Sequence, residues 1–128
     1  MQSLNKYIPG TCNIGKEEIR KRRQSGWTGL IITIIIYVFL AYAGAPPIWR
    51  LVVFVPATLA AVGFLQAYMH FCAYFGSVGV FNFGEVGKTD TVEQAEFRKI
   101  DRKKAIEIVA SSILIGAAVA IAAYFLPV

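Results

Sequence analysis

Three long apolar runs constrain the fold of this chain more than any other feature of its sequence. The central run, Leu51 to Phe75, contains no charged residue, and similar runs flank it from Leu30 to Ala45 and from Ile106 to Val128. About 20 apolar residues are enough for a helix to cross a bilayer. Because the backbone inside a bilayer must satisfy its own hydrogen bonds, these runs predict three membrane-spanning α-helices.

The composition agrees with this interpretation. Of the 128 residues, 56% are hydrophobic and 16% are charged, whereas soluble domains are about half apolar and about a quarter charged. Three crossings of roughly 20 residues occupy about half of the chain. No room is left for a second, soluble domain, so we expect a single transmembrane domain over residues 1–128.

Turn-forming residues set the expected bounds of the helices. Pro46 and Pro47 stop the first helix, and so short a link predicts that the first two helices form an antiparallel hairpin. Thr91, with Gln94 three residues later, is a capping-box pattern that marks the start of the third helix. We therefore expect an all-α integral membrane protein with helices at about 26–44, 49–75 and 91–126.

The segments outside the crossings are charged or aromatic. The basic stretch 16–23 allows a helix to begin near Lys16, before the first crossing. The charged stretch 91–104 is expected to form a cytoplasmic helical extension that continues into the third crossing. Between them, we expect the loop 76–90 to lie at the membrane surface, with Phe81 and Phe83 dipping into the bilayer.

Lysine and arginine residues are distributed asymmetrically along the chain. Six precede the first crossing, Arg50 alone lies in the first link, and six lie between the second and third crossings, which accounts for all 13. The positive-inside rule then places the N-terminus and the second loop in the cytoplasm and the C-terminus on the opposite side. We assign the net charge of +5 to topology and to anionic lipid headgroups, not to nucleic acid.

His70 is the one histidine of the chain and the only candidate for cofactor chemistry. A neutral imidazole in a membrane helix can ligate the metal of a haem or chlorophyll, or pass protons. The alternative is a histidine that is hydrogen-bonded within the helix bundle. Helical spacing puts Gly63, Gln66 and Ala73 on the same face as His70, so Gln66 is the nearest partner for such a bond.

A stripe of small residues in the third crossing is a second candidate site, of a different kind. Ser112, Gly116 and Ala120 recur at a spacing of four, so they share one face of the helix. Small side chains let two membrane helices approach closely. We expect this stripe to form a helix-packing contact, either within the bundle or with a partner.

Other patterns do not amount to a site. The sequence 87–89 matches the end of a phosphate-binding loop, but Asn82 stands where the motif requires a glycine. Cys12 and Cys72 are too few for a disulfide framework, and we expect both to be free thiols. Cys72 also diverges from His70 on a helix, so a metal pair is not expected. Glu107 is expected to reach the membrane interface.

These features favour a non-catalytic small subunit of a larger membrane protein complex, with other membrane subunits as partners. Two alternatives remain open. One is a protein that binds haem or chlorophyll through His70. The other is a small homo-oligomeric transporter or channel, which is disfavoured because transport pathways are usually marked by charges inside the crossings.

Overall fold

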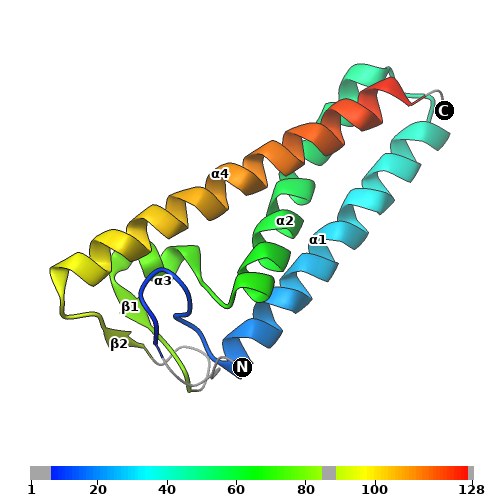
Figure 1. Ribbon diagram of the computed structural model, residues 1–128. Helices are drawn as coiled ribbons and strands as arrows, with labels where there is room; N and C mark the ends of the chain where they lie inside the picture. The colour runs from blue at the N-terminus through cyan, green and yellow to red at the C-terminus, as the bar shows by residue number, and fades with distance from the viewer. Residues whose placement is uncertain (1–6, 85–88, 127–128) are drawn as a thin grey trace.

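Three long helices dominate the fold (Figure 1). The structure, a computed structural model, describes residues 7–84 and 89–126. In chain order the elements are α1 (Lys16–Tyr42), the 3-10 helix η1 (Pro47–Val53), α2 (Phe54–Met69), the short helix α3 (Ala73–Val78), the strands β1 (Val80–Phe81) and β2 (Asp90–Thr91), and α4 (Ala95–Phe125).

Three of these helical segments are long and apolar enough to span a membrane, as in a multi-pass membrane protein. They are Lys16–Tyr42, Pro47–Met69 and Ala95–Phe125. At a rise of 1.5 Å per residue the 31 residues of α4 extend over about 46 Å, whereas the hydrocarbon core of a bilayer is roughly 30 Å thick. The surplus length of α4 corresponds to its charged first turns.

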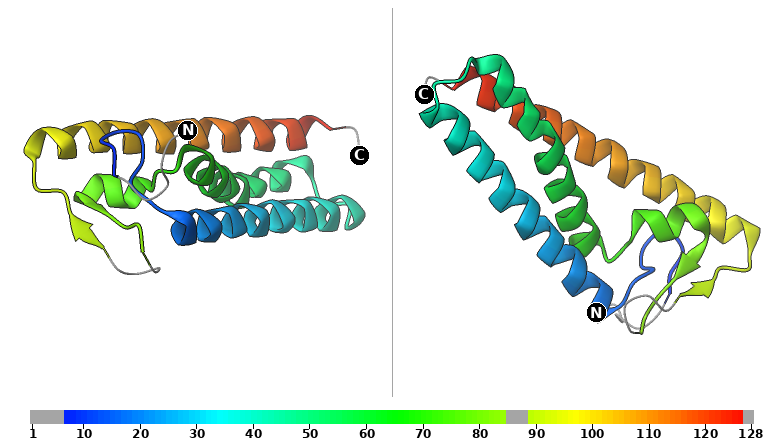
Figure 2. Two further views of the ribbon diagram at one scale, coloured as in Figure 1. Left: turned by 60° about the horizontal axis from the view of Figure 1, so that its bottom comes forward. Right: turned by 180° about the vertical axis from the view of Figure 1, so that it is seen from behind.

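The helix α2 lies between α1 and α4, so the three helices form an open arrangement instead of a closed bundle (Figure 2). Small residues set the close approach of α1 and α2. A Cβ atom added to Gly63 would lie 2.6 Å from the Gly26 backbone nitrogen, and one added to Gly29 would lie 2.9 Å from that of Ala60. Because only small residues fit there, dispersion contacts between the two backbones hold these helices together.

The second crossing differs from the continuous helix predicted over 49–75. It starts as the 3-10 helix η1, continues as α2 and ends at Met69, and α3 begins only at Ala73. The prediction was wrong because it considered apolar length alone. Residues 70–75 turn away from the axis of α2 and lie beyond the candidate span. The first helix also begins at Lys16, well before residue 26.

The start of α4 also differs from the prediction. Thr91 lies in strand β2, and the helix begins at Ala95 with Gln94 as its N-cap, without a side-chain capping hydrogen bond. The capping-box prediction was therefore wrong. Pairing of Val80 with Thr91 in the two-stranded sheet keeps Thr91 extended, so it cannot act as a cap.

The cap is a small compact unit at one end of the helices. It consists of residues 7–15, α3, β1, β2 and the first turns of α4 (Figure 1). The ring of Phe81 stacks on that of Tyr7 with centroids 4.9 Å apart, and Phe83 lies 6.0 Å from Phe81. Phe81 thus packs against protein, which corrects the expectation that it dips into the bilayer.

Candidate functional site

The break after α2 is organised by His70. Its backbone is left-handed, with φ 55° and ψ 40°, a conformation that costs a non-glycine residue about 1–2 kcal/mol. The N–H groups of His70 and Phe71 both donate to the Gln66 carbonyl, the latter at 3.1 Å. The Phe71 side chain is fully buried and packs near Leu65 and Met69. This arrangement is a Schellman-type helix end with its usual hydrophobic contact.

Asn13 forms hydrogen bonds with the backbone that follows this break, between the end of α2 and the start of α3. Its side-chain oxygen accepts a hydrogen bond from the Cys72 N–H at 2.7 Å, and its amide donates to the Cys72 carbonyl at 3.2 Å. The Asn13 N–H also donates to the His70 carbonyl at 3.1 Å. Because Asn13 is completely buried, one side chain satisfies backbone groups that would otherwise be unpaired away from water.

Gln66 joins the end of α2 to the start of α3. Its side-chain oxygen accepts a hydrogen bond from the Ala73 N–H at 2.7 Å. The expected bond between Gln66 and His70 is therefore not the one that forms. The common face expected for Gly63, Gln66, His70 and Ala73 was also wrong, because the helix on which that spacing depends ends at Met69.

A buried ion pair connects the start of α1 to the cap. One carboxylate oxygen of Glu18 accepts from the Arg22 guanidinium at 2.6 Å, and the other accepts from the Asn82 amide at 2.8 Å. The Arg22 guanidinium also donates to the Cys72 sulfur at 2.9 Å and lies 5.5 Å from the ring centre of Phe75. Since Glu18 is only 1% exposed, this pairing compensates the cost of burying its charge.

Asp101 anchors the N-terminal segment to α4. It is fully buried, and its two carboxylate oxygens accept from the Tyr7 hydroxyl at 2.5 Å and from the Gly10 N–H at 2.7 Å. Burial raises the pKa of Tyr7 above its ordinary value, and the hydrogen bond to Asp101 raises it further. Tyr7 therefore stays protonated and keeps donating to Asp101 throughout the physiological range.

The structure places His70 one residue beyond the second candidate span, which ends at Met69. The residue is half-buried, and no described residue forms a hydrogen bond with its imidazole. Within 7–84 and 89–126, no group of three or more His, Cys, Asp or Glu residues is placed to hold a metal ion. His70 thus has a defined backbone role at the helix end.

Ser112, Gly116 and Ala120 are all buried on α4. A Cβ atom added to Gly116 would collide with the Thr58 hydroxyl of α2, and Ala120 belongs to a small core with Val53. In this structure the stripe therefore lies along the contact of α4 with η1 and α2.

Arg50 lies at the end of the molecule opposite the cap. It is 5% exposed, and its guanidinium donates to the carbonyls of Ala123 at 3.1 Å and Leu126 at 2.9 Å. It also lies 5.5 Å from the ring centre of Tyr37. Arg50 thus satisfies carbonyl groups at the C-terminal end of α4 and complements the helix dipole there.

The remaining sequence candidates have simpler surroundings. Cys12 and Cys72 are both buried and both free, and burial raises the pKa of the Cys12 thiol. Glu107 is exposed and lies 3.8 Å from the Lys104 ammonium. Most of the phosphate-loop-like stretch 87–89, which lacks the glycine that the motif requires at position 82, lies outside the described residues.

Sequence reasoning missed the residues that build the cap. Asn13, Glu18, Asn82 and Asp101 are polar residues in segments that were treated as solvated or irregular, yet each is at most 2% exposed. Their partners lie far away in the chain, so no local pattern marks them. The contact of α1 with α2 did carry a signal, because Gly26 and Gly29 lie about one helical turn apart and small residues let membrane helices approach closely.

The fold and its buried polar cap define a small helical protein with three potential membrane spans. No protein-family model matches the chain, and comparison with curated proteins and with solved structures likewise found no match.

Proposed function

We propose that this protein is a non-catalytic, three-span subunit of a larger membrane protein complex, to which it contributes packing and assembly contacts. The observation that carries the proposal is the low burial of the two outer helices. Of their apolar segments, 17% in α1 and 28% in α4 is buried within the chain, compared with 39% in the central span. Because α1 and α4 flank α2, each leaves most of its apolar surface free to contact other membrane helices.

The use of polar groups in the cap supports a non-catalytic role. Asn13, Glu18 and Asp101 each bind backbone or side-chain groups of the same chain. Such mutually satisfied networks hold a structure rigid. The cap therefore presents a shaped surface to a partner on the same side as the charged first turns of α4.

The proposed topology places the N-terminus and the cap in the cytoplasm and the C-terminus on the opposite side. The first two helices form an antiparallel hairpin, and the charged first turns of α4 extend from the bilayer on the cytoplasmic side. The burial of Arg50 against α4 carbonyls supports this orientation, because the single basic residue of the other side is used internally.

Cysteine accessibility tests the topology. A cysteine placed at position 128 should react with a membrane-impermeant maleimide from the external side of intact cells. The unmodified protein is the control, since Cys12 and Cys72 are buried. Labelling of position 128 only after the cytoplasmic side is opened would contradict the orientation.

The mass of the native assembly tests the subunit proposal. The protein, extracted in a mild detergent from its own membranes, should run as a hetero-oligomer of reproducible stoichiometry in native mass spectrometry, well above the 14.1 kDa of one chain. A monomer would contradict the proposal, and a homo-oligomer would favour the transporter or channel alternative.

One observation favours a second candidate function, the binding of a haem or chlorophyll. The imidazole of His70 is half-buried and accepts or donates no hydrogen bond among the described residues, so one ring nitrogen is available for a metal. The purified protein should then show visible absorption that is lost in His70→Asn. Asparagine tolerates left-handed backbone, so this variant removes the ligand without breaking the helix end.

A further inference from the structure

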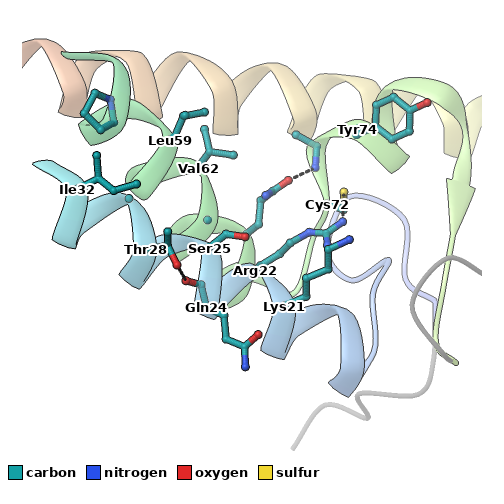
Figure 3. A pocket seen from close by; sticks show the side chains of 15 residues that line it. Lys21, Arg22, Gln24, Ser25, Thr28, Ile32, Leu59, Val62, Cys72 and Tyr74 are labelled. Carbon is teal, nitrogen blue, oxygen red and sulfur yellow. Dashed lines mark hydrogen bonds between the residues drawn. The ribbon is translucent and has the colours of Figure 1, made fainter. Parts of the chain in front are cut away.

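An open groove of about 810 Å³ lies between α1 and α2, beside the Arg22–Cys72 contact (Figure 3). Gly29 and Gly63, which lie at the close approach of α1 and α2, are among its lining residues. The volume falls within the range of about 300–1,000 Å³ that is usual for small-molecule sites. The groove is therefore of a size for one small ligand.

The α1 wall of the groove changes character along its length. Lys21, Ser25, Thr28 and Ile32 all line it, and their spacings of four, three and four put them on one face of the helix. An ammonium group is followed by two hydroxyl groups and then by an apolar side chain. Figure 3 shows these side chains in this order along α1.

The α2 wall changes in the same direction. Gly63 approaches Gly26, and Ala60 approaches Gly29, so residue numbers fall along α2 as they rise along α1. Gln66 therefore lies towards the Lys21 end, whereas Leu59 lies towards the Ile32 end. The side chains on both walls therefore change from polar near Lys21 to apolar near Ile32. This order matches an amphiphile whose headgroup lies at the Lys21 end.

The charge at the polar end is positive. Two carboxylates lie in this part of α1: Glu18 is bound by Arg22 and Asn82, and Glu17 lies 3.5 Å from the Arg20 guanidinium. The Lys21 side chain is exposed, and no carboxylate among the described residues lies within 4.0 Å of its ammonium. An anionic headgroup is therefore the complementary ligand.

We propose that this groove binds one anionic phospholipid, with its phosphate beside Lys21 and Ser25 and an acyl chain along Ile32 and Leu59. An apolar helix from a partner fits less well, because it would leave the Lys21 ammonium and the Ser25 hydroxyl without polar contacts. The proposal goes beyond the subunit function, since it requires that α1 and α2 span a bilayer but not that a partner is present.

Lipid counting on the isolated chain tests this site. The full-length protein in detergent is mixed with phosphatidylglycerol or phosphatidylcholine of the same acyl chains, and bound lipids are counted by native mass spectrometry. We expect one phosphatidylglycerol per chain, bound at least about fivefold more tightly than phosphatidylcholine, because one lysine near an anionic lipid contributes about that factor. Equal retention of the two lipids would overturn the proposal.

A matched pair of charge variants locates the headgroup. Lys21→Gln should lower the preference for phosphatidylglycerol about fivefold. Arg23→Gln removes the same charge from the same helix, but Arg23 does not line the groove, so its preference should match that of the unmodified protein. If both variants lower the preference equally, the attraction is diffuse and the site is wrong.

A second pair locates the acyl chain. Leu59 is 60% exposed and lines the groove, whereas Leu114 is 71% exposed on α4, so tryptophan is sterically tolerated at both positions. Leu59→Trp should lower phosphatidylglycerol binding several-fold by filling the groove, and Leu114→Trp should not. Unchanged binding to a folded Leu59→Trp variant would overturn the proposal. Because these measurements use the isolated chain, failure to find a partner subunit would not affect them.

Discussion

The side chain of Asn13 forms two hydrogen bonds with the backbone of Cys72, accepting at 2.7 Å and donating at 3.2 Å. These residues are separated by 59 positions, so the contact closes the N-terminal segment over the break between α2 and α3. The Asn13 side-chain amide thus pairs with the N–H and the carbonyl of Cys72 in the way that the backbone of a neighbouring β-strand would. It is one of the contacts that hold the cap against the end of α2.

Replacing Asn13 should loosen the cap. Asn13→Ala leaves the buried N–H and carbonyl of Cys72 without partners, at a cost of about 1–3 kcal/mol each. We expect a clear fall in the thermal midpoint of the detergent-solubilised protein, together with faster trypsin cleavage near Lys16. Asn13→Asp keeps one acceptor but buries a carboxylate and sets its other oxygen against the Cys72 carbonyl, so at neutral pH its thermal midpoint should be no higher than that of Asn13→Ala. An Asn13→Ala variant as stable as the unmodified protein would contradict this role.

Position 70 should be governed by its backbone conformation. Glycine adopts φ 55° without strain, so His70→Gly should preserve stability or raise it by up to about 1 kcal/mol. His70→Val should lower stability by at least about 1 kcal/mol, because a β-branched residue is strongly disfavoured at positive φ. Denaturation midpoints that rank valine above glycine would show that the left-handed helix end is wrong.

Gly116 should tolerate no large side chain. Gly116→Leu forces a side chain into the Thr58 hydroxyl on α2, and overpacking of this kind costs about 1–3 kcal/mol or more. Ala118→Leu is the control, since residue 118 is exposed on the same helix. Thermal unfolding should separate the two variants clearly. Equal midpoints would mean that α4 does not pack on α2 through Gly116.

The contact between Tyr7 and Asp101 should weaken at high pH. The folded pKa of Tyr7 is raised above its unfolded value of about 10. The contact therefore contributes its full stability below pH 10, and the contribution is lost as the pH rises above that value because the unfolded chain releases the proton first. Tyr7→Phe should be less stable at pH 7 by about 1 kcal/mol and should lose less stability between pH 9 and 12.

Denaturation midpoints measured across this pH range check the prediction. Lysine titration affects both proteins alike, so the difference between them isolates Tyr7. If the two curves stay parallel from pH 7 to 12, Tyr7 does not share a proton with Asp101 in the folded state.

The sequence by itself determined the three apolar spans. Their length and hydrophobicity are local properties, and a bilayer leaves the backbone of such a run no alternative to a helix. The stripe at Ser112, Gly116 and Ala120 could also be identified locally, because helical periodicity alone puts these residues on one face.

Only the tertiary structure decided where the second span ends and how the cap closes over it. The run 51–75 contains no charged residue, and no glycine or proline lies between residues 64 and 75, so nothing local distinguishes the helix up to Met69 from the left-handed turn at His70. That turn is stabilised by Asn13 and by the burial of Phe71, and these contacts exist only once distant segments meet. Hydrogen bonds between residues far apart in sequence leave no periodic trace, and for that reason the helix break and its polar cap could not be predicted from sequence.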